Sequence, residues 1–128
     1  MIKYTTENVN PKNKKTTDCV VRALTKATGR PYKDVFMELV ALSLKTGYFV
    51  NEKRLEDKFL EANGFVKMKQ PRKSDNTKYE IGEIDKLIKR GTVIIRCAHH
   101  LTCVKDNVLY DTWDCRHKCI SNYYIKTC

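Results

Sequence analysis

The stretch "AHHLTCVKDNVLYDTWDC", residues 98–115, decides the fold that we predict for this chain. It contains two runs rich in β-branched and aromatic residues, separated by Asp106 and Asn107. Both residues tolerate the positive φ that a tight turn requires. We therefore expect a β-hairpin with strands over 100–105 and 108–113. The stretch also holds two of the three histidines and the only tryptophan, so it is the first place to look for a functional site.

The turn determines which side chains of this hairpin share a face. A two-residue turn pairs Thr102 with Asp111. Because side chains alternate along a strand, His100 and Asp111 become diagonal neighbours, and His99 points to the opposite face. A three-residue turn would flip one strand and exchange the two histidines. A histidine oriented by a carboxylate is half of a nucleophilic site, although the same pair could instead be purely structural.

The rest of the chain divides into helices followed by strands. Apolar periodicity predicts helices over 18–29, 31–47 and 51–64, with Thr17 or Asp18 capping the first and Asn51 the third. A short strand over 65–69, a polar loop over 70–79 and a short helix ending at Gly91 follow. Further strands are expected over 92–97 and 119–126. Helices first and an antiparallel meander second are typical of an α+β fold.

The length of 128 residues indicates a single domain over 1–128, in which residues 1–15 form a polar N-terminal arm. No apolar run approaches the roughly 20 residues of a membrane helix. The polar start predicts no signal peptide, so we expect a cytoplasmic protein of a bacterium or a phage-infected host cell, with reduced cysteines.

Cys19 is the candidate nucleophile, because it falls in the first turn of the first predicted helix. At that position the helix dipole and unpaired N–H groups favour a thiolate, and a nearby imidazolium would lower the pKa of the thiol further. The other five cysteines lie in or after the strands. The alternative is that Cys19 is a small buried apolar residue of an amphipathic helix.

The order of these residues resembles that of papain-like cysteine peptidases. In that family a cysteine begins a helix, a histidine follows on a strand, and an acid or amide lies on the next strand within an Asn-Ser-Trp sequence. "DTW" (residues 111–113) resembles this element, with aspartate in place of asparagine. The chain also resembles small phage and prophage proteins, through "TDCVVRAL" (17–24) and "HLTCVKDNVLYDTWD" (100–114), and this resemblance extends over about residues 10–124.

The resemblance implies a papain-like fold, with N-terminal helices packed on a C-terminal antiparallel sheet. It implies a catalytic triad of Cys19, His100 and Asp111, with Trp113 shielding the hydrogen bond between the last two from water. It also implies hydrolysis of a peptide, isopeptide or other amide bond of a protein or peptide substrate by thiol acyl transfer, with no metal or organic cofactor.

The family's oxyanion hole has a glutamine six residues before the cysteine. Asn13 occupies that position here, and Asn10 is a second candidate. Arg22 lies one turn after Cys19. We expect it to pair with Asp18 or with a carboxylate in the core, or alternatively to bind a substrate carboxylate.

A zinc site is the main alternative use of the C-terminal cysteines. The residues that suggest it are Cys97, Cys103, Cys115, His117 and Cys119. Their spacings do not match the familiar zinc motifs, so no metal is expected. Disulfides among Cys115, Cys119 and Cys128 are possible in an oxidised preparation. We expect Asp114 to be a turn residue, and His99 and His117 to lie at the surface.

The net charge of +10 invites a nucleic-acid interpretation. The lysines are spread along the whole chain, which predicts only weak non-specific nucleic-acid binding. The alternative to an enzyme is therefore a catalytically weak or inactive basic module that contacts a host protein or nucleic acid.

Overall fold

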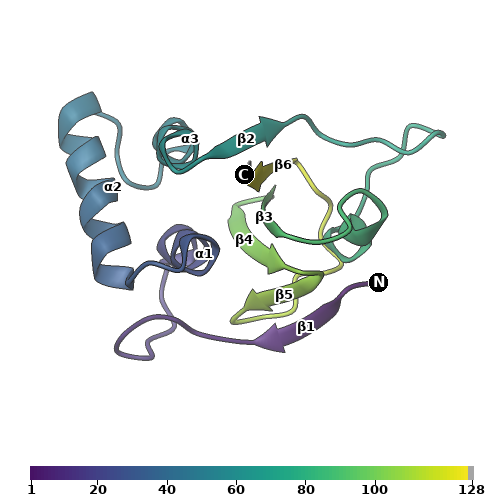
Figure 1. Cartoon of the computed structure of the whole chain (residues 1–128), viewed down its shortest axis with the longest axis horizontal. Coiled ribbons are helices and arrows are strands. Elements are labelled where there is room, and N and C mark those ends of the chain that lie inside the picture. The colour runs from purple at the N-terminus through teal and green to yellow at the C-terminus, as the bar shows by residue number, and fades with distance from the viewer. Residues whose placement is uncertain (127–128) are drawn as a thin grey trace.

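A six-stranded mixed sheet forms the frame of the molecule, with strand order β1-β5-β4-β3-β6-β2 (Figure 1). The computed structural model describes residues 1–126. The strands are β1 (Lys3–Thr6), β2 (Phe65–Met68), β3 (Thr92–Cys97), β4 (His100–Lys105), β5 (Val108–Asp111) and β6 (Asn122–Lys126). The helices are α1 (Cys19–Thr28), α2 (Tyr32–Thr46), α3 (Lys53–Ala62) and the 3₁₀ helix η1 (Ile81–Lys86). The predicted α+β class is confirmed.

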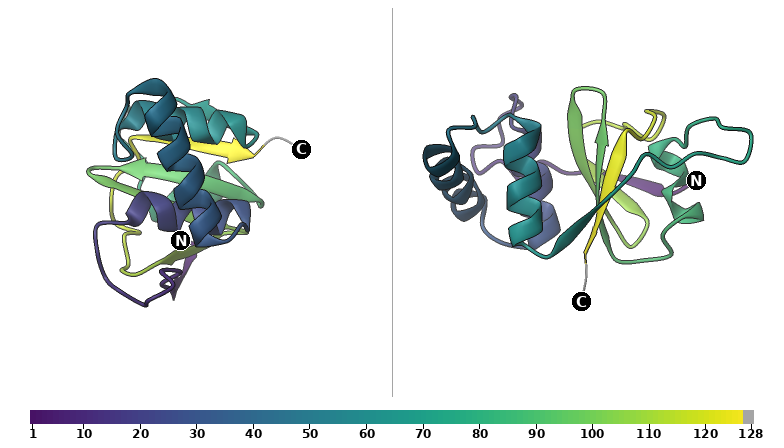
Figure 2. Two further views of the ribbon diagram at one scale, coloured as in Figure 1. Left: turned by 90° about the vertical axis from the view of Figure 1, so that its left-hand side faces the viewer. Right: turned by 90° about the horizontal axis from the view of Figure 1, so that it is seen from above.

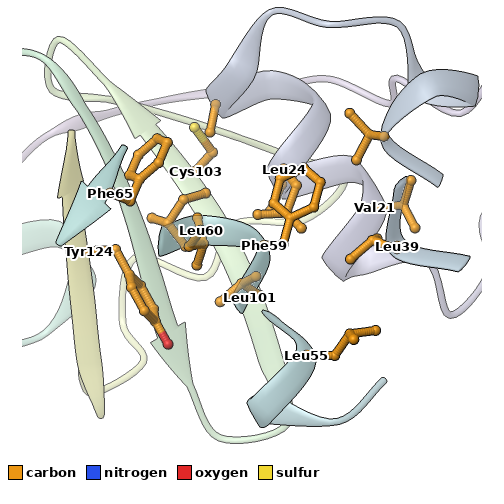
Figure 3. Close-up of a cluster of buried hydrophobic side chains, with 14 residues drawn as sticks. Val21, Leu24, Leu39, Leu55, Phe59, Leu60, Phe65, Leu101, Cys103 and Tyr124 are labelled. Carbon is orange, nitrogen blue, oxygen red and sulfur yellow. The ribbon is translucent and has the colours of Figure 1, made fainter. Parts of the chain in front are cut away.

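The two faces of the sheet have separate cores. Helices α1, α2 and α3 lie on one side of the sheet and η1 lies on the other (Figure 2). The alternation of β4 divides its side chains between them: Leu101 and Cys103 join the helix-side core, and Val104 joins the core under η1. The labelled members of the helix-side core are drawn in Figure 3: Val21, Leu24, Leu39, Leu55, Phe59, Leu60, Phe65, Leu101, Cys103 and Tyr124. Burying each large apolar side chain contributes about 1.5–3 kcal/mol.

The predicted hairpin register is confirmed. Val104 pairs with Leu109 and Lys105 with Val108, around a two-residue turn of Asp106 and Asn107. Both turn residues have positive φ, 46° and 62°, as the right-handed twist of the flanking strands favours. The last backbone pair between β4 and β5 is Cys103–Tyr110. Asp111 therefore contacts β4 through its side chain and not through its backbone.

The predicted all-antiparallel sheet is wrong at one edge, where β1 pairs in parallel with β5. Residues 1–15 are therefore not simply a polar arm. Ile2 is buried in the core under η1, and β1 satisfies the edge of β5 that would otherwise be unpaired. β1 has only four residues and a largely exposed side-chain pattern, which gives no period to recognise.

Several predicted element ends also differ from the structure. The third helix begins after Glu52, not Asn51, because the Glu52 carboxylate accepts the backbone N–H of Phe49 at 2.6 Å and closes the preceding turn. The short helix is a 3₁₀ helix that ends at Lys86. β5 stops at Asp111, and the last strand begins only at Asn122. In the described part of the chain, none of the helices has both the length and the apolar character needed to cross a bilayer.

Candidate active site

The side chain of the cap residue of α1 binds the side chains of other residues and not the backbone of the helix. Asp18 occupies the cap position, but its carboxylate makes no capping hydrogen bond. It accepts instead from Arg22 Nε at 2.7 Å, the Asn10 amide at 2.9 Å and the Tyr32 hydroxyl at 2.9 Å. No side-chain cap therefore competes for the first N–H groups of α1, which have no partner within the helix. Cys19 is the first residue of this turn.

Asp111 is the centre of the site. It is 3% exposed, and both of its oxygens accept hydrogen bonds. Oδ2 accepts from His100 Nε2 and from Thr102 Oγ1, each at 2.6 Å. Oδ1 accepts from Arg22 Nη1 at 3.0 Å and from the Thr112 N–H at 2.7 Å. Burial raises the pKa of this carboxyl, but the bonds from His100 and Thr102 outweigh it and lower the pKa to about 2, so Asp111 is an anion.

His100 is largely buried between Asp111 and the thiol of Cys19. Asp111 takes Nε2, and the thiols of Cys19 and Cys115 both lie beside the ring. Burial lowers the pKa of the imidazole, but the hydrogen bond and charge of Asp111, together with the neighbouring thiols, raise it well above its usual range. The ring therefore carries a proton at neutral pH.

The environment of Cys19 favours its thiolate. Burial raises the pKa of this half-buried thiol, but the hydrogen bonds from the His100 ring and the Leu101 backbone, with the charges of His100 and Arg22, more than offset it. The net result is a pKa below the ordinary value. A thiolate beside an imidazolium is the reactive form of a cysteine nucleophile.

Trp113 lies against the His100 ring. The ring centroids are 5.0 Å apart, and the planes are inclined by 54°. Trp113 lies beyond the end of β5, in a bend rather than in the predicted strand, and it is 41% exposed. Its indole contacts the imidazole, as the predicted shielding role requires.

Arg22 links α1, which begins with Cys19, to β5, which ends with Asp111. Its guanidinium bonds to Asp18 on one side and to Asp111 on the other, and the three side chains are all at most 10% exposed. The expected pairing with Asp18 or with a core carboxylate is confirmed for both partners. This chain of buried ion pairs fixes α1 against β5, and thereby Cys19 against His100.

A cleft of about 600 Å³ opens beside Cys19 and His100. Its walls come from the N-termini of α1 and α3, the β3–β4 turn and the bend after β5. The lining residues are Thr16, Thr17, Cys19, Val20, Arg22, Asn51, Lys53, Glu56, Arg96, Cys97, His99, His100, Leu101, Thr112 and Trp113. Cys19 thus lines the cleft, whereas Asp111 does not.

The two asparagines considered for the oxyanion hole lie elsewhere. Asn13 is exposed, at a positive φ of 52°, and does not line the cleft. The Asn10 side chain is occupied by Asp18 and by the backbone of the arm. The structure therefore brings neither amide to Cys19. Neutral side-chain donors that do line the cleft include the Thr16, Thr17 and Thr112 hydroxyls and the Asn51 amide.

His99 occupies the two-residue turn between β3 and β4, with a positive φ of 56°. It is exposed, as predicted, and it lines the cleft without contacting Asp111. Asp114 pairs with Arg116 rather than with His100. His117 is exposed, as predicted.

The residues proposed for zinc do not converge. Cys103 is buried in the helix-side core, whereas Cys119 is exposed. A different group does converge: potential ligand atoms of His100, Asp111 and Cys115 lie within 4.8 Å of one another. The Asp111 oxygens already accept four close hydrogen bonds, one of them from an arginine cation, so this group fits a shared proton better than a metal ion. The five cysteines within residues 1–126 are free thiols, and Cys128 lies outside the described residues.

Two contributors to the site were not predicted as site residues. Strand alternation puts Thr102 on the same face as Asp111, and the bond from its hydroxyl to Asp111 follows from that position. The Cys115 thiol lies 3.8 Å from Asp111 Oδ2 because the chain bends back after Asp111, and no periodic pattern marks such a bend.

Comparisons of the chain with protein-family models, with curated proteins and with solved structures give no match.

Proposed function

We propose that this protein is a papain-like cysteine hydrolase that cleaves a peptide, isopeptide or other amide bond by thiol acyl transfer, and, from the resemblance of its motifs, that it is encoded by a phage or prophage. One observation carries the proposal. A cysteine at an uncapped helix N-terminus faces an imidazole whose other nitrogen is held at 2.6 Å by a buried carboxylate. A purely structural histidine–aspartate pair does not require a lowered-pKa thiol at the mouth of a cleft.

The proposed reaction uses each group of the triad once in each half. The Cys19 thiolate attacks the carbonyl carbon, and the Cys19 backbone N–H donates to the resulting oxyanion. The tetrahedral intermediate collapses by breaking the C–N bond, and the His100 imidazolium gives its Nδ1 proton to the departing amine. Asp111 fixes the tautomer that leaves Nδ1 toward the thiol and stabilises the charged ring.

The second half of the reaction regenerates the enzyme. Water attacks the thioester, and neutral His100 takes its proton. The C–S bond breaks, which releases the acid and restores the thiolate and the imidazolium. The net change is one amide bond and one water converted to an acid and an amine, with no cofactor.

The arrangement of elements supports the papain-like part of the proposal. The nucleophile begins a helix that packs against the strand bearing the histidine, and the acid lies on the next strand. The cleft lies between the helical part and the strand ends, so a substrate would contact both. The parallel edge strand β1 lies on the far side of β5 from β4 and leaves this arrangement unchanged.

Alkylation by iodoacetamide tests the proposal, with the modified cysteine identified by mass spectrometry. We expect Cys19 to react much faster near neutral pH than exposed Cys119. His100→Ala should remove that difference, and the matched variant His99→Ala should preserve it. If Cys19 reacts no faster than Cys119, the enzyme proposal fails and the basic binding module becomes the better account of the chain.

A further inference from the structure

The wall of the cleft formed by α3 has a single carboxylate, and that carboxylate is neutralised. Glu56 is 3% exposed and accepts a hydrogen bond from Arg96 Nη1 at 2.5 Å. Arg96 is itself fixed from behind, since it donates to Tyr124 Oη at 2.6 Å and to Asn122 Oδ1 at 3.2 Å. Glu56 is therefore committed to a structural pair, and it does not offer a free negative charge to a substrate.

Lys53 lines the same wall and is free to face the solvent. It is exposed, and it belongs to none of the ion pairs formed within residues 1–126. Its charge also reaches Glu56. Burial and the charge of Asp57 raise the pKa of Glu56, the charge and hydrogen bond of Arg96 and the charge of Lys53 oppose that rise, and the net result is a raised pKa. Arg96 also pairs with Asp57 at 3.6 Å, so both carboxylates and the guanidinium of this cluster are engaged with one another. Among the charged groups of α3 that line the cleft, Lys53 is the one that forms no ion pair within residues 1–126.

The surroundings add to the positive field at this wall. The exposed residues Lys14 and Lys15 directly precede Thr16, which lines the opposite wall of the cleft. Helices α1 and α3 both begin at the cleft, so the positive ends of two helix dipoles lie there, each next to the acidic residue at its cap position, Asp18 or Glu52. The whole chain carries a net charge of +10, which attracts anions over a longer range.

We propose that the cleft selects an acidic peptide, in which an aspartate or glutamate side chain lies against Lys53 while Cys19 attacks a nearby carbonyl. This inference rests on the proposed function and names its substrate class. A peptide is favoured over a nucleic acid because the thiolate requires a carbonyl carbon beside the bound anion, and a phosphodiester backbone has none.

A pair of alkylating reagents of similar size tests the field without any substrate. Iodoacetate is an anion and iodoacetamide is neutral, and with both reagents the Cys19 sulfur displaces iodide to form a thioether. The measured quantity is the rate of Cys19 alkylation by iodoacetate divided by the rate with iodoacetamide. Dividing it by the same ratio for the free thiol N-acetylcysteinamide corrects for the intrinsic reactivity of the reagents, and the result should exceed one at low ionic strength. Lys53→Gln should lower it about two- to fivefold, and concentrated salt should abolish the difference. Lys58→Gln, which alters an exposed lysine of α3 that does not line the cleft, should leave the ratio unchanged.

Protection experiments then identify the class of ligand. A capped triglutamate peptide should slow the alkylation of Cys19 by iodoacetamide in the wild-type protein and in Lys58→Gln, and much less in Lys53→Gln. The inference is overturned if a capped trilysine peptide protects better. It is also overturned if a single-stranded DNA oligonucleotide protects with the same dependence on Lys53.

The two proposals fail in different ways. If Cys19 is unreactive toward both reagents, the hydrolase proposal itself is wrong. If Cys19 is highly reactive but indifferent to the charge of the reagent and of the peptide, only the preference for acidic peptides is wrong.

Discussion

Replacing Asp111 with asparagine should remove a specific, pH-dependent part of the stability of this protein. The variant keeps the size of the side chain and loses its charge. The pKa of Asp111 is lowered from 3.8 to about 2 in the folded protein. Each pKa unit corresponds to about 1.4 kcal/mol, so the ionised carboxylate contributes about 2.5 kcal/mol to the free energy of unfolding near neutral pH.

The sign of the pH dependence follows from the lowered pKa. A carboxyl whose pKa is lower in the folded state stabilises the protein above its unfolded pKa, and this contribution is lost as the pH falls through the folded pKa. The difference in unfolding free energy between wild type and Asp111→Asn should therefore shrink by about 2 kcal/mol between about pH 5 and about pH 2. Over this window His100 is protonated in both the folded and the unfolded state, so it adds nothing to the change.

Urea unfolding followed by circular dichroism at the two pH values measures this difference. Asp34→Asn, an exposed aspartate of α2, is the matched control and should change the unfolding free energy by less than about 0.5 kcal/mol. A gap between wild type and Asp111→Asn that stays constant with pH would refute the reasoning, because Asp111 would then not be stabilised as an anion.

Two further predictions concern the groups around the triad. Arg22→Met leaves Asp18 without its cationic partner and removes one of the two cations that bond to Asp111, and it should cost about 3–5 kcal/mol in urea unfolding. Exposed Arg54→Met should cost less than about 0.5 kcal/mol, and equal effects of the two variants would contradict the structural role of the ion-pair chain. The fluorescence of Trp113, the only tryptophan, should stay quenched by the neighbouring His100 imidazolium well above neutral pH, because the pKa of that ring is raised. A fluorescence transition at the pKa of an ordinary histidine would show that Asp111 does not hold the proton on the ring.

The parts of the site that the sequence predicted well are local in the chain. His100 and Asp111 belong to one hairpin, so its two-residue turn and the strict alternation of strands determine their relation. The same alternation separated His99 from the acid. The position of Cys19 at the start of a helix also follows from the local sequence pattern. The proximity of Cys19 to His100 is a tertiary contact, which only the family resemblance suggested.

The parts that the sequence did not predict depend on contacts between distant segments or on irregular backbone. β1 is too short to show a period, and it forms because β5 offers an unpaired edge. The path of the arm near Asn13 is determined by turn hydrogen bonds of Asn8 and Asn10, so counting residues back from Cys19 could not place that amide. Cys115 reaches Asp111 through a bend, which has no repeating pattern.

The pKa of the Cys19 thiol tests the central claim most directly. It can be measured from the ultraviolet absorbance of the thiolate as a function of pH, with Cys19→Ala subtracted to remove the other cysteines. The account predicts a pKa below that of an ordinary cysteine, a rise of that pKa in His100→Ala, and no change in His99→Ala. A thiol in the wild-type protein that titrates at or above the ordinary value would contradict the account.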